Sequence, residues 1–249
     1  MPVLLSCAKL KTFPTTRLKI TMAVFSSELR PVMMSLKAED VVRLLDLPLI
    51  ARLYKMEENP AETLNMDALI ELGLLKRDDQ GLYLISGIAG FFFARTFSPF
   101  PTLARTGIRV VRYPGTDKSG IPTPRFFDGG YARTFTEAVQ FVRQMTPAFD
   151  TGYAIDDIRF LLANLLSQRA PQDPAPIAII EIFDDRIEFF RSGDDDRAWA
   201  NPKTADLLKR FFFKETDDFN TLALLLGLKT VPDMDVTPTG TRFVLEAKK

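Results

Sequence analysis

The chain has 249 residues, 46% of them hydrophobic, which is enough to bury a core in one large domain or two small ones. Its 32 basic and 32 acidic residues balance, and this excludes a global positive field that would attract nucleic acid or a membrane surface. No histidine occurs and Cys7 is the only cysteine, so histidine-dependent catalytic triads and internal disulfides are excluded.

The same composition limits metal chemistry and favours one compartment. Zinc and iron sites are not expected without histidine or paired cysteines, which leaves Mg²⁺ held by oxygen ligands. A single cysteine fits a reducing cytoplasm. No apolar run reaches the roughly 18 residues of a transmembrane helix, so we expect a cytoplasmic protein with no membrane partner.

Residues 1–35 are weakly patterned and are predicted to form a segment of their own. From Ser35, which is a suitable helix N-cap, apolar side chains such as Val41 recur at helical spacing. Pro48 suits the first turn of a second helix. A third helix is predicted over about residues 61–72 and ends at Gly73.

A polar turn and two further elements follow the third helix. The turn at residues 78–81 leads into a strand predicted over residues 82–86, and a helix is predicted over residues 87–95. Helix, glycine, basic pair, turn and strand in this order predict a winged-helix-like part over residues 36–100.

Basic residues of this part are the best candidates for contacts with nucleic acid. In a winged helix, Lys76 and Arg77 of the wing, together with Arg95 and Arg105, would neutralise DNA phosphates. The alternative is an ordinary surface hairpin, which the zero net charge of the chain favours.

Residues 101–249 predict a sheet with helices packed on it. The strands are predicted over residues 107–113, 177–183, 187–190 and 241–247, and the helices over residues 129–145, 155–166, 202–213 and 219–228. The triplets Phe91–Phe93 and Phe211–Phe213 are predicted in the core. One ring of each should line an interface, because three consecutive helical side chains cannot face one core.

The helix and strand pair between residues 155 and 193 carry a family resemblance. The helix contains RFLLANLLSQR at residues 159–169, and the strand pair is EIFDDRIEFFRSG at residues 181–193. These segments resemble the motifs R-E-L-V-A-N-A-L-x-H-x-D and E-I-F-D-D-R-I-E-I-x-N-P-G of the ATP-binding domain in bacterial RecG-like regulators. In that family, a GHKL-type (Bergerat) nucleotide fold usually follows a Schlafen-type, AlbA-like domain.

The resemblance implies an α+β protein in which the winged-helix-like part precedes a GHKL-like sheet with helices packed on it. The sheet part would cover residues 101–249. Residues 1–35 would be a remnant of the AlbA-like domain or an upstream extension.

The resemblance also assigns roles to single residues. Asn164 would hold Mg²⁺ against nucleotide phosphates, and Gly193 would be what remains of a phosphate-side glycine; the alternative for Asn164 is a buried asparagine that satisfies a backbone group. The carboxylate that should activate water one turn earlier is Phe160 here, and the H-x-D motif is Ser167-Gln168-Arg169. The glycine-rich loop is replaced by Asp217-Asp218, which places negative charge where a triphosphate would lie.

These departures predict a non-catalytic regulatory or scaffolding protein with no cofactor. The Asp184-Asp185-Arg186 run is typical of a tight turn, despite its match to the family. One alternative is an ATPase that binds ATP and Mg²⁺ with Asn164 at the metal. Another is a DNA-binding regulator that uses residues 61–95. A protein partner or self-association is expected, and DNA is a further candidate partner.

Overall fold

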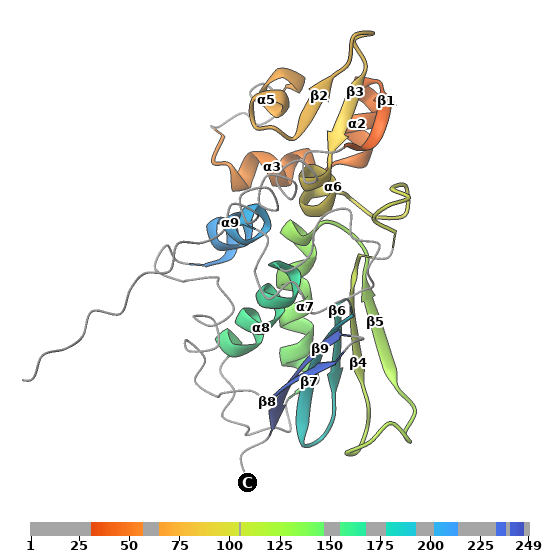
Figure 1. Cartoon of the computed structure of the whole chain (residues 1–249), viewed down its shortest axis with the longest axis vertical. Helices are drawn as coiled ribbons and strands as arrows, with labels where there is room; N and C mark the ends of the chain where they lie inside the picture. Colours follow the sequence, from red (N-terminus) through yellow and green to blue (C-terminus); the bar gives the residue numbers. More distant parts are fainter. Residues whose placement is uncertain are drawn as a thin grey trace, which may run out of the picture.

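The computed structural model describes residues 31–56, 65–104, 106–146, 155–167, 178–192, 202–213, 233–237 and 240–246. Over these residues the chain is an α+β protein with a three-stranded sheet and a six-stranded sheet, which confirms the predicted fold class. Figure 1 shows the small sheet and its helices at one end of the molecule and the large sheet at the other. None of the helices in these ranges is long and apolar enough to cross a membrane.

The small sheet and the helices around it form what we call the N-terminal unit, residues 31–93. Its elements are β1 (Pro31–Leu36), α2 (Ala38–Leu44), α3 (Leu47–Leu53), α5 (Met66–Glu71), β2 (Leu75–Arg77), β3 (Tyr83–Ser86) and α6 (Gly87–Phe93). The strands are antiparallel in the order β1-β3-β2. The unit therefore begins earlier than the predicted boundary at residue 36.

The start of the first helix differs from the prediction. Ser35 lies in β1 with a φ of 59°, and α2 begins only at Ala38. The Asp40 carboxylate accepts a hydrogen bond of 3.0 Å from the Lys37 backbone N–H and thereby caps the helix. At the other predicted helix end, Gly73 has a φ of 70°, which is the left-handed conformation expected after α5.

The six-stranded sheet has the order β5-β4-β6-β7-β9-β8. Its strands are β4 (Ile108–Arg112), β5 (Thr123–Phe127), β6 (Ala178–Ile182), β7 (Arg186–Ser192), β8 (Asp233–Thr237) and β9 (Gly240–Glu246). Only the β4–β6 pair is parallel, and every other neighbouring pair is antiparallel. The helix predicted over residues 219–228 lies outside the described residues.

Helices α7 (Tyr131–Met145) and α8 (Ile155–Ser167) lie along the large sheet, and α9 (Pro202–Phe212) packs on α8 beside the N-terminal unit. A row of aligned residues across four strands is fully buried on the face that α7 and α8 cover; it consists of Val110, Ile180, Phe189 and Phe243. Alternation along each strand therefore sends one set of side chains to the helices and the other to the opposite face.

Both phenylalanine triplets lie at the junction between the N-terminal unit and the rest of the molecule. Every residue of α6 is buried, including all three rings of Phe91–Phe93. Phe211 of α9 contacts Phe92, Phe93 and Tyr54 through ring centroids 5.6–6.3 Å apart. The sequence predicted one ring of each triplet at an interface. In the structure all three rings of the first triplet are buried inside the molecule, where α6 contacts α7 and α9.

Candidate functional site

Helix α8 carries the residues that the family resemblance singles out. It packs against α7, α9 and strands β6 and β7. Two acidic residues in its first turn, Asp156 and Asp157, favour the helix start electrostatically. Apolar residues dominate the rest, so the helix is held in the core by burial.

Asn164 lies in the most enclosed part of this helix. Its exposed fraction is 2%, and every residue from Leu161 to Ser167 is buried. The Ser167 hydroxyl, at the position that the resemblance aligns with the first residue of the H-x-D motif, donates to the Asn164 backbone carbonyl at 3.0 Å. The surroundings of Asn164 thus match the buried-asparagine alternative more closely than an open nucleotide pocket.

Phe160 occupies the position, one turn before Asn164, at which the resemblance would require a carboxylate. Its ring packs on Phe213 with centroids 5.1 Å apart, and Phe213 also contacts Phe135 of α7. This position is therefore part of an aromatic cluster between three helices.

Asp157 is the nearest buried carboxylate along the helix. It is 1% exposed and lies on the same face as Asn164, because seven residues make almost two full turns. The same seven residues separate the two side chains by about 10 Å along the helix axis. One water molecule between a metal on Asn164 and a base at Asp157 does not span that distance.

Several predicted positions lie outside the described residues. These are the glycine, the last two residues aligned with the H-x-D motif and the acidic pair in place of the glycine-rich loop: Gly193, Gln168, Arg169, Asp217 and Asp218. Arg105, named for nucleic acid, also lies outside them. Their assigned roles stay predictions.

The Asp184-Asp185-Arg186 run forms the turn between β6 and β7 and also holds the loop after β4. Asp184 exchanges two hydrogen bonds with the backbone of Gly115, each 2.9 Å long, and its carboxylate pairs with Arg112. The hydrogen bond from Arg112 is the main reason that the pKa of Asp184 is lowered, and the Gly115 N–H adds to it. The Arg186 guanidinium donates to the Thr116 carbonyl at 2.8 Å. This supports the structural interpretation of the run.

Sequence reasoning missed a buried charged group on the other face of the large sheet. Glu188 accepts from Arg186 Nε at 2.6 Å and from Arg242 Nε at 2.9 Å. Burial alone would raise the pKa of Glu188, but the hydrogen bonds and charges of Arg242 and Arg186 outweigh it and lower the pKa. The alternation of side chains along β7 predicts that Glu188 points to this face. The sequence does not show the register between β7 and β9, which brings Arg242 beside Glu188.

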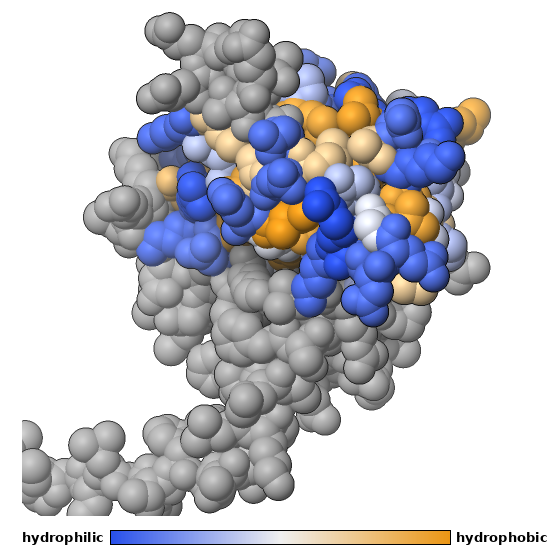
Figure 2. All heavy atoms as spheres, turned by 90° about the horizontal axis from the view of Figure 1, so that it is seen from above, coloured by the Kyte–Doolittle hydropathy of each residue, from blue (hydrophilic) through white to orange (hydrophobic). Residues whose placement is uncertain are grey.

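The basic residues named for DNA are only partly available to phosphates. Lys76 and Arg77 are exposed on β2, but Arg77 donates to Asp67 of α5 at 3.1 Å and to the Tyr83 hydroxyl at 3.0 Å. The helix before the wing also carries Glu71 and no basic residue. Figure 2 shows that hydrophilic side chains surround smaller hydrophobic patches at this end of the molecule.

Arg95 lies just after the N-terminal unit, two residues beyond the end of α6. Its backbone N–H donates to the Leu44 carbonyl at the end of α2, and its carbonyl accepts from Arg133 of α7 at 2.5 Å. None of its described contacts brings it to β2. The structure therefore groups Lys76 with Arg77 and ties Arg95 to the junction with α7.

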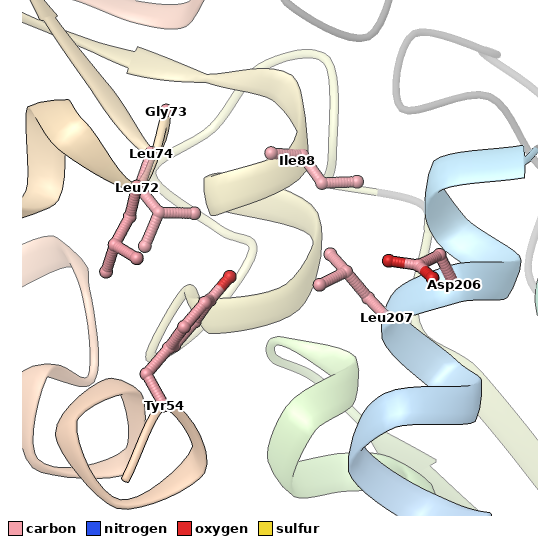
Figure 3. Close-up of a pocket in the computed structure, with 7 residues that line it drawn as sticks. All are labelled: Tyr54, Leu72, Gly73, Leu74, Ile88, Asp206 and Leu207. Carbon is pink, nitrogen blue, oxygen red and sulfur yellow. The ribbon is translucent and has the colours of Figure 1, made fainter. Parts of the chain in front are cut away.

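A cavity of about 240 Å³ lies between the N-terminal unit and α9. Figure 3 shows its lining, which comprises Tyr54, Leu72, Gly73, Leu74, Ile88, Asp206 and Leu207. Burial raises the pKa of Tyr54, the Arg210 charge opposes that shift and the Asp206 charge adds to it. The phenol therefore stays protonated at neutral pH. Asn164 does not line this cavity.

Comparison with known proteins supports the fold alone. No protein-family model and no curated protein matches the chain. Three solved chains match in structure, and one of them is the DIP2311 protein from Corynebacterium diphtheriae. It superposes on 88% of this chain with a TM-score of 0.58 and 11% sequence identity. The matched part spans 40% of that longer protein, and at this identity the likeness establishes a shared fold only.

Proposed function

We propose that this chain is a regulatory or scaffolding protein that works by binding a partner and performs no nucleotide hydrolysis. It would share its ancestry with the RecG-like ATP-binding regulators and have lost their chemistry. The observation that carries the proposal is the aromatic ring at residue 160, packed on Phe213 where a water-activating carboxylate should be. An aromatic ring accepts no proton, so the position cannot serve as a general base.

The surroundings of Asn164 support the same proposal. A metal-binding amide needs its oxygen open to the ion and to the phosphates that share it. At 2% exposure, Asn164 offers no such opening in this conformation. The alternative, an ATPase with Mg²⁺ on Asn164, would require both a movement of the surrounding chain and a base other than Phe160.

Calorimetric titration of the full chain with ATP and Mg²⁺ tests the proposal. We expect no binding that depends on Asn164 and no phosphate release. Micromolar binding that Asn164→Ala abolishes would refute the proposal. Thr134→Ala is the matched control, because it alters an equally buried polar residue on the neighbouring helix α7, and melting curves of both variants report whether they fold.

DNA binding through residues 61–95 is the second candidate. It is favoured by the order of elements, since α5 directly precedes the β2–β3 hairpin. The charges oppose it, because Asp67 and Glu71 lie on the helix that would enter the major groove. We expect no gel shift at low salt. A shift that weakens with salt and with Lys76→Ala would instead support the DNA-binding role.

A further inference from the structure

A groove with a basic rim lies between α7 and α8, and Asn164 is not part of its lining. It encloses about 230 Å³ and is lined by Phe135, Thr136, Val139, Gln140 and Arg143 of α7 and by Arg159 of α8. Phe135 and Val139 are buried and form an apolar floor, whereas Thr136, Gln140 and Arg143 are exposed at the rim. None of these six lining residues is a carboxylate, and two of them are cations.

Arg159 is held in place before any ligand arrives. Its guanidinium lies 4.9 Å from the centre of the Phe213 ring and donates to the backbone carbonyl of Phe212 at the end of α9. A guanidinium fixed in this way loses little conformational entropy when it binds an anion. Arg143, in contrast, is exposed and forms no ion pair with any residue that the structure describes.

Two carboxylates among the described residues lie close in sequence to residues of the groove, and neither cancels these cations. Asp156 contacts Arg159 at 3.3 Å, but its side chain is mostly exposed, so the pair is weak. Glu137 is exposed on α7 beside Thr136 and does not line the groove. The lining therefore presents two guanidinium groups, an amide and a hydroxyl above an apolar floor.

We propose that this groove binds the phosphate group of a small organic phosphate monoester. Guanidinium forks match the spacing of phosphate oxygens and form charge-assisted hydrogen bonds with them. Thr136 and Gln140 supply further donors, and Phe135 and Val139 accommodate the carbon body. The site goes beyond the proposed scaffolding role, because it would let a metabolite control a partner-binding protein.

Phenyl phosphate is a suitable probe, since it joins a phosphate to a small apolar body. We expect saturable binding to the full chain by calorimetry or ligand-observed NMR at neutral pH, with an affinity that decreases as salt is added. Arg143→Gln should weaken binding about tenfold or more, because it removes one charge-assisted contact. Arg159→Lys should also weaken it, since an ammonium lacks the planar fork.

Arg109→Gln is the matched control, because it removes an equally exposed arginine from β4 on the far side of the sheet. Neither this variant nor Asn164→Ala should change the affinity, which separates this site from a nucleotide site on α8. Binding that is absent at millimolar probe, equal in Arg143→Gln, or equally weakened by Arg109→Gln would refute the proposal. Inorganic phosphate binding as tightly as phenyl phosphate would refute the role of the apolar floor.

Discussion

The Glu188 carboxylate forms ion pairs with two arginines, Arg186 and Arg242. Glu188→Gln removes the charge that Arg186 and Arg242 share. We expect a loss of about 1–3 kcal/mol in the free energy of unfolding, less than for a fully buried pair because Arg242 is 40% exposed. Urea denaturation at neutral pH measures it. Glu181→Gln, which affects the more exposed pair with Lys118 and a 3.4 Å hydrogen bond from the Tyr113 hydroxyl, should cost about 1 kcal/mol or less.

The pH dependence of the same residue has a defined sign. The pKa of Glu188 is lower in the folded protein than its ordinary value of 4.5. Its contribution to stability is therefore complete above that value and is lost as the pH falls through the lower folded pKa. Acid should destabilise the wild type more than the Glu188→Gln variant. Equal losses in both proteins on going from neutral to acidic pH would contradict this assignment.

Single residues also mark where sequence patterns stop being informative. The pattern identified Asn164 as a polar residue in an apolar helix, but the same pattern fits an open ligand site and a closed core. The sequence predicted Arg77 as a phosphate contact, but in the structure its guanidinium donates a hydrogen bond to Asp67, ten positions earlier in the chain. In both cases the deciding fact is a neighbour from another element, and helical or strand periodicity does not encode it.

Elements were predicted best where the periodic signal was strong. Residues 131–145, 155–167 and 202–212 are helical as predicted, because their apolar faces recur at helical spacing. The strands β1, β5 and β8 were not predicted. β5 contains Pro124 and lies at the sheet edge, where a missing N–H is tolerated. β1 pairs with β3 through register shifts, so its side chains do not alternate regularly.

The β6–β7 turn anchors the loop after β4, and this role is testable at the level of the element. Asp184→Ala removes the side-chain hydrogen bond from the Gly115 N–H and the ion pair with Arg112. The backbone hydrogen bond from Asp184 to the Gly115 carbonyl remains. We expect faster amide hydrogen exchange in residues 113–118 and a small loss of stability, about 1 kcal/mol. Asp185→Ala is the control, because Asp185 pairs only with Arg186 of the same turn in the described contacts. Unchanged exchange in the loop would show that other contacts hold it.

At the scale of the molecule, aromatic contacts join the two parts that were predicted from the sequence, residues 36–100 and 101–249. Rings from α3, α6, α7 and α9 contact one another in a continuous series. The backbone at the start of α7 also packs closely on α6. A Cβ on Gly130, the N-cap of α7, would lie 2.2 Å from the Phe92 carbonyl oxygen, so only glycine fits there. The sequence predicted the aromatic core but not that it joins the parts, because both triplets are equally compatible with two separate cores.

Phe211 is the ring through which α9 reaches the N-terminal unit. Phe211→Ala should lower the stability by about 2 kcal/mol and raise hydrogen exchange in α3 and α6, because the contacts with Tyr54, Phe92 and Phe93 are lost. Phe213→Ala is the matched control two residues away, since the Phe213 ring contacts Phe160 and Phe135. It should raise exchange in α7 and α8 and leave α3 protected. If Phe211→Ala leaves exchange in α3 and α6 unchanged, contacts other than the Phe211 ring join the two parts, such as those between α6 and α7.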